Sequence, residues 1–240
     1  MFGLAVATGM LVAAAEETNN MAKRTPAYAD PARFENEIKA FEAADRTNRP
    51  PAGTIVVAGS STIRMWRGDM ASDLAPLTVI PRGFGGSTVN DLLHYASRVI
   101  VPYKPRAVVL YEGDNDIGAG IPPAMVATKF ESLIALLHQE LPRARIYCLA
   151  VKPSPSRWAL WPKMVKLNAA MQALCERDPL LTYVDVATPM LDADGQPRAS
   201  LYKADKLHMT RKGYDVWTRV IRPALLEKEG AFETTPGAAR

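Results

Sequence analysis

The amino-acid sequence predicts an α/β fold, a three-layer αβα sandwich built on a parallel sheet of five strands. Two observations carry this prediction. Short apolar runs rich in β-branched residues recur along the chain, and segments with apolar residues at helical spacing separate them. Strands that alternate with helices form a parallel sheet, and the connecting helices cover both of its faces. The predicted strands are residues 54–57, 77–80, 107–111, 145–151 and 181–186.

The composition is that of a globular protein. The 240 residues are 48% hydrophobic and 22% charged, which is enough apolar chain for a sizeable core. We expect one domain over residues 29–230, because α/β folds of this length usually form a single unit. The formal net charge is +4, but the basic residues are scattered and do not alternate with aromatic ones. This pattern argues against a nucleic-acid partner.

The first segment has the pattern of a targeting signal. Residues 1–15 are apolar after Met1, end in three alanines, and are too few to span a bilayer. We therefore expect a signal peptide, a disordered lead-in over residues 16–28, and a periplasmic or secreted protein without stable membrane insertion. Because no Lys or Arg precedes the apolar run, a start at Met21 and a cytoplasmic protein are the alternative. A disordered tail is predicted for residues 231–240.

The predicted domain opens with a helix over residues 31–44. Asp30 is suited to cap this helix, and Pro31 is suited to its first position. A segment rich in proline, residues 48–53, then breaks the chain before the first strand.

A glycine turn and two serines follow the first strand. Residues 54–57 lead through Gly59 to Ser60 and Ser61, and residues 62–66 have a helical pattern. A serine at this place either caps the helix or lies at the carboxyl end of a parallel strand, where such sheets bind ligands. Amides at a helix start also point toward a bound group.

The middle of the chain has two further strands, each followed by a loop. We expect the strand at residues 77–80 to end at Pro81 and a glycine-rich loop to follow over residues 82–87. A helix is predicted at residues 89–99, and the strand after it leads into an acidic loop at residues 112–120.

The last third repeats the alternation. A long helix is predicted over residues 122–141, an irregular loop over residues 152–161, and a helix from residue 161 or 162 to 176. The segment 201–208 then leads into a final helix over residues 210–229. The two cysteines, Cys148 in a strand and Cys175 on an apolar helix face, are expected to be buried; their spacing does not indicate a zinc site, and export would permit a disulfide between them.

Four loops at the carboxyl edge of the predicted sheet carry groups suited to acyl transfer. Ser61 is a candidate nucleophile, and Gly86 and Asn115 offer hydrogen-bond donors. Asp205 and His208 are three residues apart and share a face on a helical turn. A carboxylate there can hold one ring nitrogen, while the other accepts a proton from the serine. No metal or cofactor is needed for this chemistry.

Each of these residues also has an ordinary structural role. Gly86 suits a turn, Asn115 suits a turn that bonds its own backbone, Asp205 suits a cap, and His208 suits a surface site. Taken one at a time, these roles are at least as common as the functional ones. All of them together at strand ends are poorly explained by chance.

The same residues resemble the conserved blocks of the SGNH (GDSL-type) hydrolase superfamily, in particular the branch similar to the platelet-activating-factor acetylhydrolase catalytic subunits. The four matching blocks are Gly59-Ser60-Ser61, Gly86 within F-G-G-S-T, residues 113–116 as G-x-N-D, and residues 205–208 as D-x-x-H. The resemblance spans residues 54 to about 221 and implies a flavodoxin-like arrangement of the sheet.

The resemblance assigns a role to each block. It implies a triad of Ser61, His208 and Asp205, and an oxyanion hole made by the amides of Ser61 and Gly86 and the side chain of Asn115. The first block departs from the family pattern, because Ser60 replaces the usual aspartate and Thr62 the common leucine. These departures leave the hydrogen bonding of the turn open.

The implied function is hydrolysis of a short-chain acyl ester, such as acetyl on a carbohydrate or a lipid-like alcohol. Aromatic residues are candidates to line the substrate pocket, although packing in the core is the alternative for at least some of them. The candidates are Trp66, Phe84, Tyr111, Trp158 and Trp161. The sequence does not define the oligomeric state.

Three alternatives stay open. The chain is either this esterase, a lysophospholipase or thioesterase with the same chemistry, or a non-catalytic carbohydrate- or lipid-binding protein on the same fold. A metal-dependent hydrolase that uses Asp114, Asp116 and His208 is disfavoured, because these residues lack the spacing of metal ligands.

Overall fold

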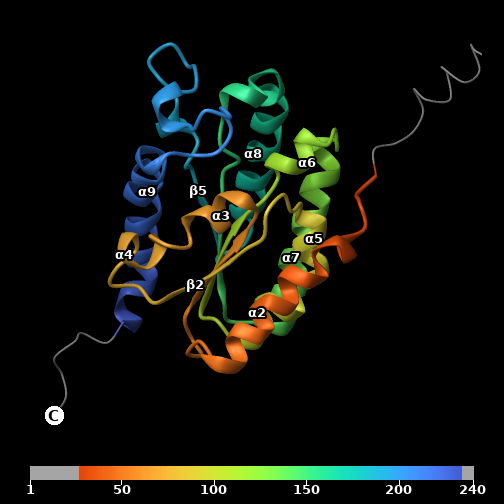
Figure 1. The fold of residues 1–240 in the computed structure, drawn as a ribbon, viewed down its shortest axis with the longest axis vertical. Coiled ribbons are helices and arrows are strands. Elements are labelled where there is room, and N and C mark those ends of the chain that lie inside the picture. Colours follow the sequence, from red (N-terminus) through yellow and green to blue (C-terminus); the bar gives the residue numbers. More distant parts are fainter. Residues whose placement is uncertain (1–26, 234–240) are drawn as a thin grey trace, which may run out of the picture.

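A computed structural model describes residues 27–233, and at its centre lies a five-stranded sheet (Figure 1). The strands are β1 (Ile55–Gly59), β2 (Val79–Gly83), β3 (Ala107–Tyr111), β4 (Arg145–Leu149) and β5 (Leu181–Val184). Their order across the sheet is β2-β1-β3-β4-β5, and all four pairings are parallel. The predicted α/β class and the flavodoxin-like strand order are confirmed.

Helices connect the strands. They are α2 (Glu35–Thr47), α3 (Ser61–Trp66), α4 (Met70–Asp73), α5 (Val89–Val99), α6 (Asp114–Gly118), α7 (Pro123–Glu140), α8 (Trp161–Cys175) and α9 (Arg211–Glu229). Short 3-10 helices occupy Pro31–Phe34, Val101–Tyr103, Pro155–Leu160, Thr188–Met190, Ala199–Leu201 and Gly230–Phe232. As predicted, Asp30 caps the first of these, because its side chain accepts a hydrogen bond from the amide of Ala32.

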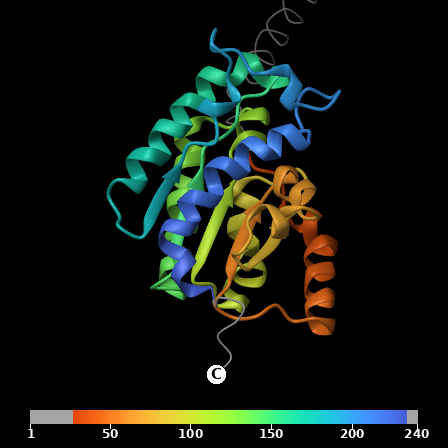
Figure 2. The ribbon, with the colours of Figure 1, turned by 90° about the vertical axis from the view of Figure 1, so that its left-hand side faces the viewer.

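Two apolar clusters cover the two faces of the sheet. Neighbouring strand residues point to opposite faces, so Val56 and Ala58 belong to one cluster and Ile55 and Val57 to the other. The first cluster includes buried residues of α2, α5, α7 and α8, and the second those of α3, α4 and α9. Figures 1 and 2 show the resulting three layers. A sheet buried on both faces explains why its strands are continuously apolar in sequence.

Two local predictions were wrong. Pro81 does not end the second strand but lies inside β2, paired with Val57. Because β2 is an edge strand, a residue without an N–H group is tolerated there. The loop predicted at residues 112–120 contains the short helix α6, whose start is capped by the Asp116 carboxylate through a 3.0 Å hydrogen bond from the amide of Gly113.

The structure describes little of the predicted N-terminal segments but includes the first residues of the predicted tail. The predicted signal peptide and most of the lead-in lie outside the described residues. The tail was predicted to begin at residue 231, but Gly230–Phe232 forms a 3-10 helix, and Glu233 accepts hydrogen bonds from the backbone and hydroxyl of Thr78. Over residues 27–233, no helix is both long enough and apolar enough to cross a bilayer.

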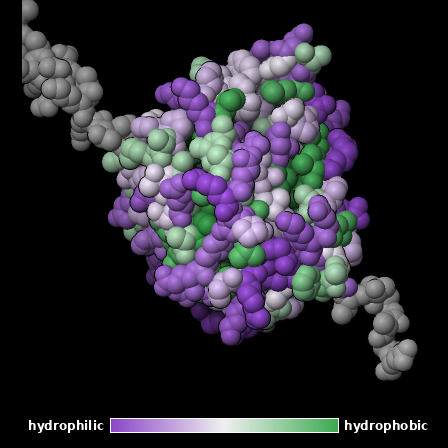
Figure 3. Space-filling model, turned by 180° about the vertical axis from the view of Figure 1, so that it is seen from behind, coloured by the Kyte–Doolittle hydropathy of each residue, from purple (hydrophilic) through white to green (hydrophobic). Residues whose placement is uncertain are grey.

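The outer surface is mixed in polarity (Figure 3), and the two thiols are buried. The face turned away from the viewer in Figure 1 mixes hydrophilic and hydrophobic residues, as is usual for a protein surface (Figure 3). Cys148 and Cys175 are free and buried, as predicted, and both belong to the cluster beneath α7 and α8.

Candidate active site

The carboxyl end of β1 makes a sharp turn into α3, and this turn places Ser61. Gly59 has a φ of +154°, and a Cβ atom at this position would lie 2.2 Å from the carbonyl oxygen of Tyr111. Only glycine fits so close to the neighbouring strand. The side chain of Ser60 does not cap α3, and Ser61 is half-buried at the first position of the helix. The turn therefore leaves the Ser61 hydroxyl free for another partner.

That partner is His208, which links Ser61 to Asp205. The distance between His208 Nε2 and Ser61 Oγ is 3.0 Å, and the distance between His208 Nδ1 and Asp205 Oδ2 is 2.7 Å. An ionised carboxylate can only accept, so Nδ1 carries the proton and donates it to Asp205. In the neutral ring, Nε2 is then the acceptor for the Ser61 hydroxyl.

The loop that carries Asp205 and His208 is held by the carboxylate itself. Asp205 Oδ1 accepts hydrogen bonds of 2.9 Å from the amides of Leu207 and His208. The hydrogen bond from the His208 ring, followed by these two, lowers the pKa of Asp205 far below its usual range, so the carboxylate stays ionised. The segment is a turn with Lys206 at a φ of +58°, and not the helical turn that the sequence predicted.

Hydrogen-bond donors from the neighbouring loops lie at the same edge. Gly86, after β2, is exposed with a φ of +83°. Asn115, after β3, donates from Nδ2 to the carbonyl of Ser87 over 2.9 Å, which uses one of its two N–H bonds. Among the described residues, the backbone N–H groups of Ser61 and Gly86 donate to no backbone carbonyl. Three donors are thus available at this edge.

A charged network fixes the loop that carries Asn115, and sequence reasoning missed it. The carboxylate of Asp114 accepts from Lys152 Nζ at 2.8 Å and from Arg157 Nη1 at 2.5 Å. The second arm of the Arg157 guanidinium donates to Asn115 Oδ1 over 3.1 Å. Burial opposes ionisation of Asp114, but the two positive charges lower its pKa below the usual value. Both cations follow β4, whose loop was not among the four predicted to carry catalytic groups, although Trp158 within it was a candidate for the substrate pocket; its position at the carboxyl edge was the available signal.

Two buried acids lie behind this edge. Glu112 accepts a 2.6 Å hydrogen bond from the hydroxyl of Ser87, and burial raises its pKa well above the usual value. Burial also raises the pKa of Asp116 to about 6, against the hydrogen bonds that it accepts from the amides of Val89 and Gly113. Asp114 and Asp116 are thus engaged with cations and amides of the chain. Over residues 27–233, no cluster of three or more metal-ligating side chains occurs.

The prediction for the substrate-binding aromatic residues was largely wrong. Trp66, Phe84 and Tyr111 are fully buried in the two core clusters, so a substrate cannot reach them. Trp158 and Trp161 are half-buried and stacked, with ring centroids 5.8 Å apart. Only these two retain exposed surface. A sequence does not reveal which aromatic residues the packing of helices on the sheet will cover.

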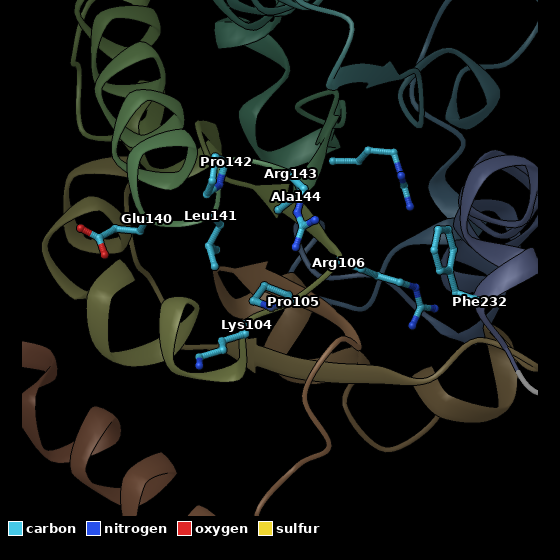
Figure 4. Close-up of a pocket in the computed structure, with 10 residues that line it drawn as sticks. Lys104, Pro105, Arg106, Glu140, Leu141, Pro142, Arg143, Ala144 and Phe232 are labelled. Carbon is cyan, nitrogen blue, oxygen red and sulfur yellow. The ribbon is translucent and has the colours of Figure 1, made fainter.

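Two cavities show where small molecules fit. One of ≈ 310 Å³ adjoins the donors at the carboxyl edge and is lined by Tyr28, Arg33, Gly86, Thr88, Asn115 and Ile121, among others. A larger one, of ≈ 600 Å³, lies at the amino ends of β3 and β4, away from the serine (Figure 4). In the larger cavity, Arg106 and Arg145 both pair with the buried Glu229 and so fasten the end of α9 to the sheet.

A serine hydroxyl bonded to a histidine that is bonded to an aspartate, at the carboxyl edge of a parallel sheet, defines the serine hydrolase class of sites. Residues 51–216 match the GDSL-like lipase/acylhydrolase family, so the chain belongs to this family. It is accordingly a carboxylic ester hydrolase. The predicted family resemblance is confirmed. No curated protein matches the chain.

Solved structures share the fold at low sequence identity. A protein from Streptococcus pneumonia, provisionally assigned as a platelet activating factor, has a TM-score of 0.71 at 19% identity, covering 89% of this chain and 99% of that one. A GDSL-like lipase from Bacteroides thetaiotaomicron has a TM-score of 0.70 at 20% identity, covering 79% and 97%. An acetyl-xylooligosaccharide esterase from Geobacillus has a TM-score of 0.58 at 13% identity, covering 74% and 94%.

Proposed function

We propose that this hydrolase cleaves short-chain acyl esters through a triad of Ser61, His208 and Asp205 and an acyl-enzyme intermediate. The observation that carries the proposal is the continuous hydrogen-bonded chain from Asp205 Oδ2 through the His208 ring to Ser61 Oγ. Without it, the serine hydroxyl would be a weak nucleophile at neutral pH.

In the first step, Ser61 Oγ attacks the ester carbonyl carbon, and His208 Nε2 takes the hydroxyl proton. Asp205 holds the ring orientation and stabilises the imidazolium. The carbonyl oxygen becomes an oxyanion, and the tetrahedral intermediate collapses when His208 returns the proton to the leaving alcohol. Water then attacks the acyl-serine, again with His208 as the base, and releases the acid and the free Ser61 hydroxyl.

The amides of Ser61 and Gly86 and the second N–H of Asn115 are the proposed oxyanion donors. All three are hydrogen-bond donors of the chain at the carboxyl edge, and none needs a metal. A donor of this kind typically contributes about 3 kcal/mol to lowering the barrier, because it acts on the charge that develops in the transition state.

The preference for a short acyl group is supported by proteins of similar fold. The ≈ 310 Å³ cavity beside Gly86 and Asn115 is not lined by Ser61 or His208, so its volume does not limit the acyl group. Among the proteins of similar fold are an acetyl esterase and an acetyl-xylooligosaccharide esterase. Acetyl esters of sugars are therefore the first natural substrates to try.

The test is hydrolysis of p-nitrophenyl acetate, butyrate and octanoate by the purified chain and by Ser61→Ala. We expect turnover that falls with chain length and a loss of at least about 1,000-fold in Ser61→Ala, with an unchanged thermal unfolding temperature. Ser72→Ala, which alters an exposed serine of α4 that bonds only the carbonyl of Asp69, is the matched control.

Each contrary outcome overturns a different part of the proposal. Full activity in Ser61→Ala would show that Ser61 is not the nucleophile. Faster turnover of the octanoate ester than of the acetate ester would show that the enzyme does not prefer short acyl chains. No turnover of any ester by the unaltered chain, or of acetylated sugars, would favour a binding protein on the same fold.

A further inference from the structure

We infer that Arg157 is a positioning residue, which sets the orientation of the Asn115 amide and thereby the third oxyanion donor. The inference rests on the proposed function, since it concerns the donor side of the same site. Arg157 forms no hydrogen bond with Ser61 or His208. Any effect of Arg157 on the reaction must therefore pass through the groups that it holds.

The contacts of Asn115 determine which end of its amide faces the site. Arg157 Nη2 donates to Asn115 Oδ1, and Asn115 Nδ2 donates to the carbonyl of Ser87. Both contacts would be lost if the amide rotated by half a turn. The Nδ2 donor would then face the Arg157 donor, and the Oδ1 acceptor would face the carbonyl oxygen of Ser87. The held orientation keeps the second N–H of Nδ2 available. A rotated amide would instead offer an oxygen to the oxyanion, which is repulsive.

Arg157 is itself fixed, as a positioning residue must be. Its Nη1 donates to the Asp114 carboxylate at 2.5 Å and to the Asp114 carbonyl at 2.9 Å. The other carboxylate oxygen is occupied by the buried Lys152. The guanidinium also lies against α6, since a Cβ atom at Gly118 would come within 3.0 Å of it. A planar guanidinium with two engaged arms has little freedom to turn.

The charges point in the same direction as the geometry. Asp114 carries one negative charge, whereas Lys152 and Arg157 carry one positive charge each. Asp116, the next residue after Asn115, has a pKa of about 6 and adds a negative charge at neutral pH, so the four groups together are close to neutral. The electrostatic effect of Arg157 is therefore local, because its donation to Oδ1 polarises the amide so that the N–H becomes a stronger donor.

A double-mutant cycle on p-nitrophenyl acetate tests the inference, with kcat and KM measured for Asn115→Ala, Arg157→Ala and the double variant. We expect Arg157→Ala to lower kcat about tenfold with KM changed less than about twofold, because a displaced donor acts in the transition state. In the Asn115→Ala background the same change should have less than about a twofold effect. Full additivity of the two losses would overturn the inference.

Two further variants separate positioning from folding. Arg157→Lys can still pair with Asp114 but lacks the second arm that reaches Asn115, so it should keep the wild-type unfolding temperature and show the kcat of Arg157→Ala. Recovery of wild-type kcat in Arg157→Lys would contradict the role of the second arm. Arg177→Ala, an exposed arginine at the end of α8 that bonds only a backbone carbonyl, is the matched control.

A spectroscopic measurement keeps this inference separate from the proposed function. The side-chain amide protons of Asn115 can be identified in a ¹H–¹⁵N spectrum as the signals missing from Asn115→Ala. In Arg157→Ala we expect their exchange with solvent to be at least about tenfold faster, since the amide is no longer held. Unchanged exchange would overturn the inference, whereas an inactive wild-type chain would overturn only the proposed function.

Discussion

The buried carboxyl of Glu112 gives the sharpest prediction, which concerns the pH dependence of folding. Its side chain is fully buried, Oε1 accepts a 2.6 Å hydrogen bond from Ser87, and within the described chain Oε2 has no partner. Burial, together with the negative charge of Asp116, raises the pKa of Glu112 well above its usual value. The folded protein therefore keeps this proton at a pH where the unfolded chain has lost it.

The direction and the size of the effect follow from linkage. When the folded pKa of an acid is raised, its contribution to the free energy of unfolding is complete below the unfolded pKa and is lost as the pH rises toward the folded pKa. The slope is about 1.4 kcal/mol per pH unit for one proton. Asp116, with a pKa of about 6, adds a similar loss at lower pH. Above a pH of about 6.5, Glu112 contributes more than Asp116 to the pH dependence of the free energy of unfolding.

The perturbation is Glu112→Gln, which cannot ionise and still accepts from Ser87. Over the pH range above the unfolded pKa in which the folded carboxyl stays protonated, the free energy of unfolding of the wild type should fall by about 1.4 kcal/mol per pH unit more than that of the variant. Urea unfolding at each pH, followed by the fluorescence of the buried Trp66 and Trp217, measures both curves. The readout is the difference between the two slopes of the free energy of unfolding against pH. The extra N–H of glutamine changes the free energy of unfolding by the same amount at every pH, so it does not affect the slope.

A matched control and a clear refutation complete this experiment. Glu140→Gln alters an exposed glutamate of α7 and should leave the slope unchanged. If Glu112→Gln and the wild type lose stability in parallel over this range, Glu112 is ionised in the folded protein. The account of a neutral acid behind Ser87 would then be wrong.

Two further predictions concern the turn and the triad. Gly59→Ala should lower the free energy of unfolding by at least about 3 kcal/mol, because its Cβ atom would clash with the carbonyl of Tyr111; urea unfolding that matches the wild type would show that the turn relaxes. Asp205→Asn should lower kcat by about 1,000-fold or more with the fold retained, since an amide facing His208 Nδ1 favours the tautomer whose Nε2 cannot accept the Ser61 proton. Wild-type kcat in this variant would exclude Asp205 from the proposed triad.

The fold could be predicted because its signals are local. Five apolar runs separated by helical patterns predict a parallel sheet without knowledge of any distant contact. The errors at Pro81 and in the loop of residues 112–120 have different causes. The first is tertiary, because it depends on β2 being an edge strand, and the strand order is not encoded in a short window of sequence. The second is local, because the Asp116 carboxylate caps α6 through the amide of Gly113, three residues earlier, and that spacing was an available signal.

The site was predictable to a similar extent. Ser61, Asn115, Asp205 and His208 stand out because their residue types suit the chemistry, and the structure brings Ser61 and His208 within 3.0 Å across 147 residues of sequence. Arg157 does not stand out, because an arginine in a loop is usually a solvated surface residue. Its proposed role becomes visible only from its hydrogen bonds with Asp114 and Asn115 in the structure.

The strand order explains why each part of the site comes from its particular loop. Ser61 follows β1, whose two hydrogen-bonded neighbours are β2 and β3, so donors can approach the serine from both sides through Gly86 and Asn115. Arg157 follows β4, the next strand beyond β3, and can therefore reach Asn115 but not Ser61. β5 lies farthest from β1, so its loop must cross the sheet edge to bring His208 to the serine. The chain provides this reach in residues 185–210, between β5 and α9, and the amides that Asp205 binds fix the end of that long segment.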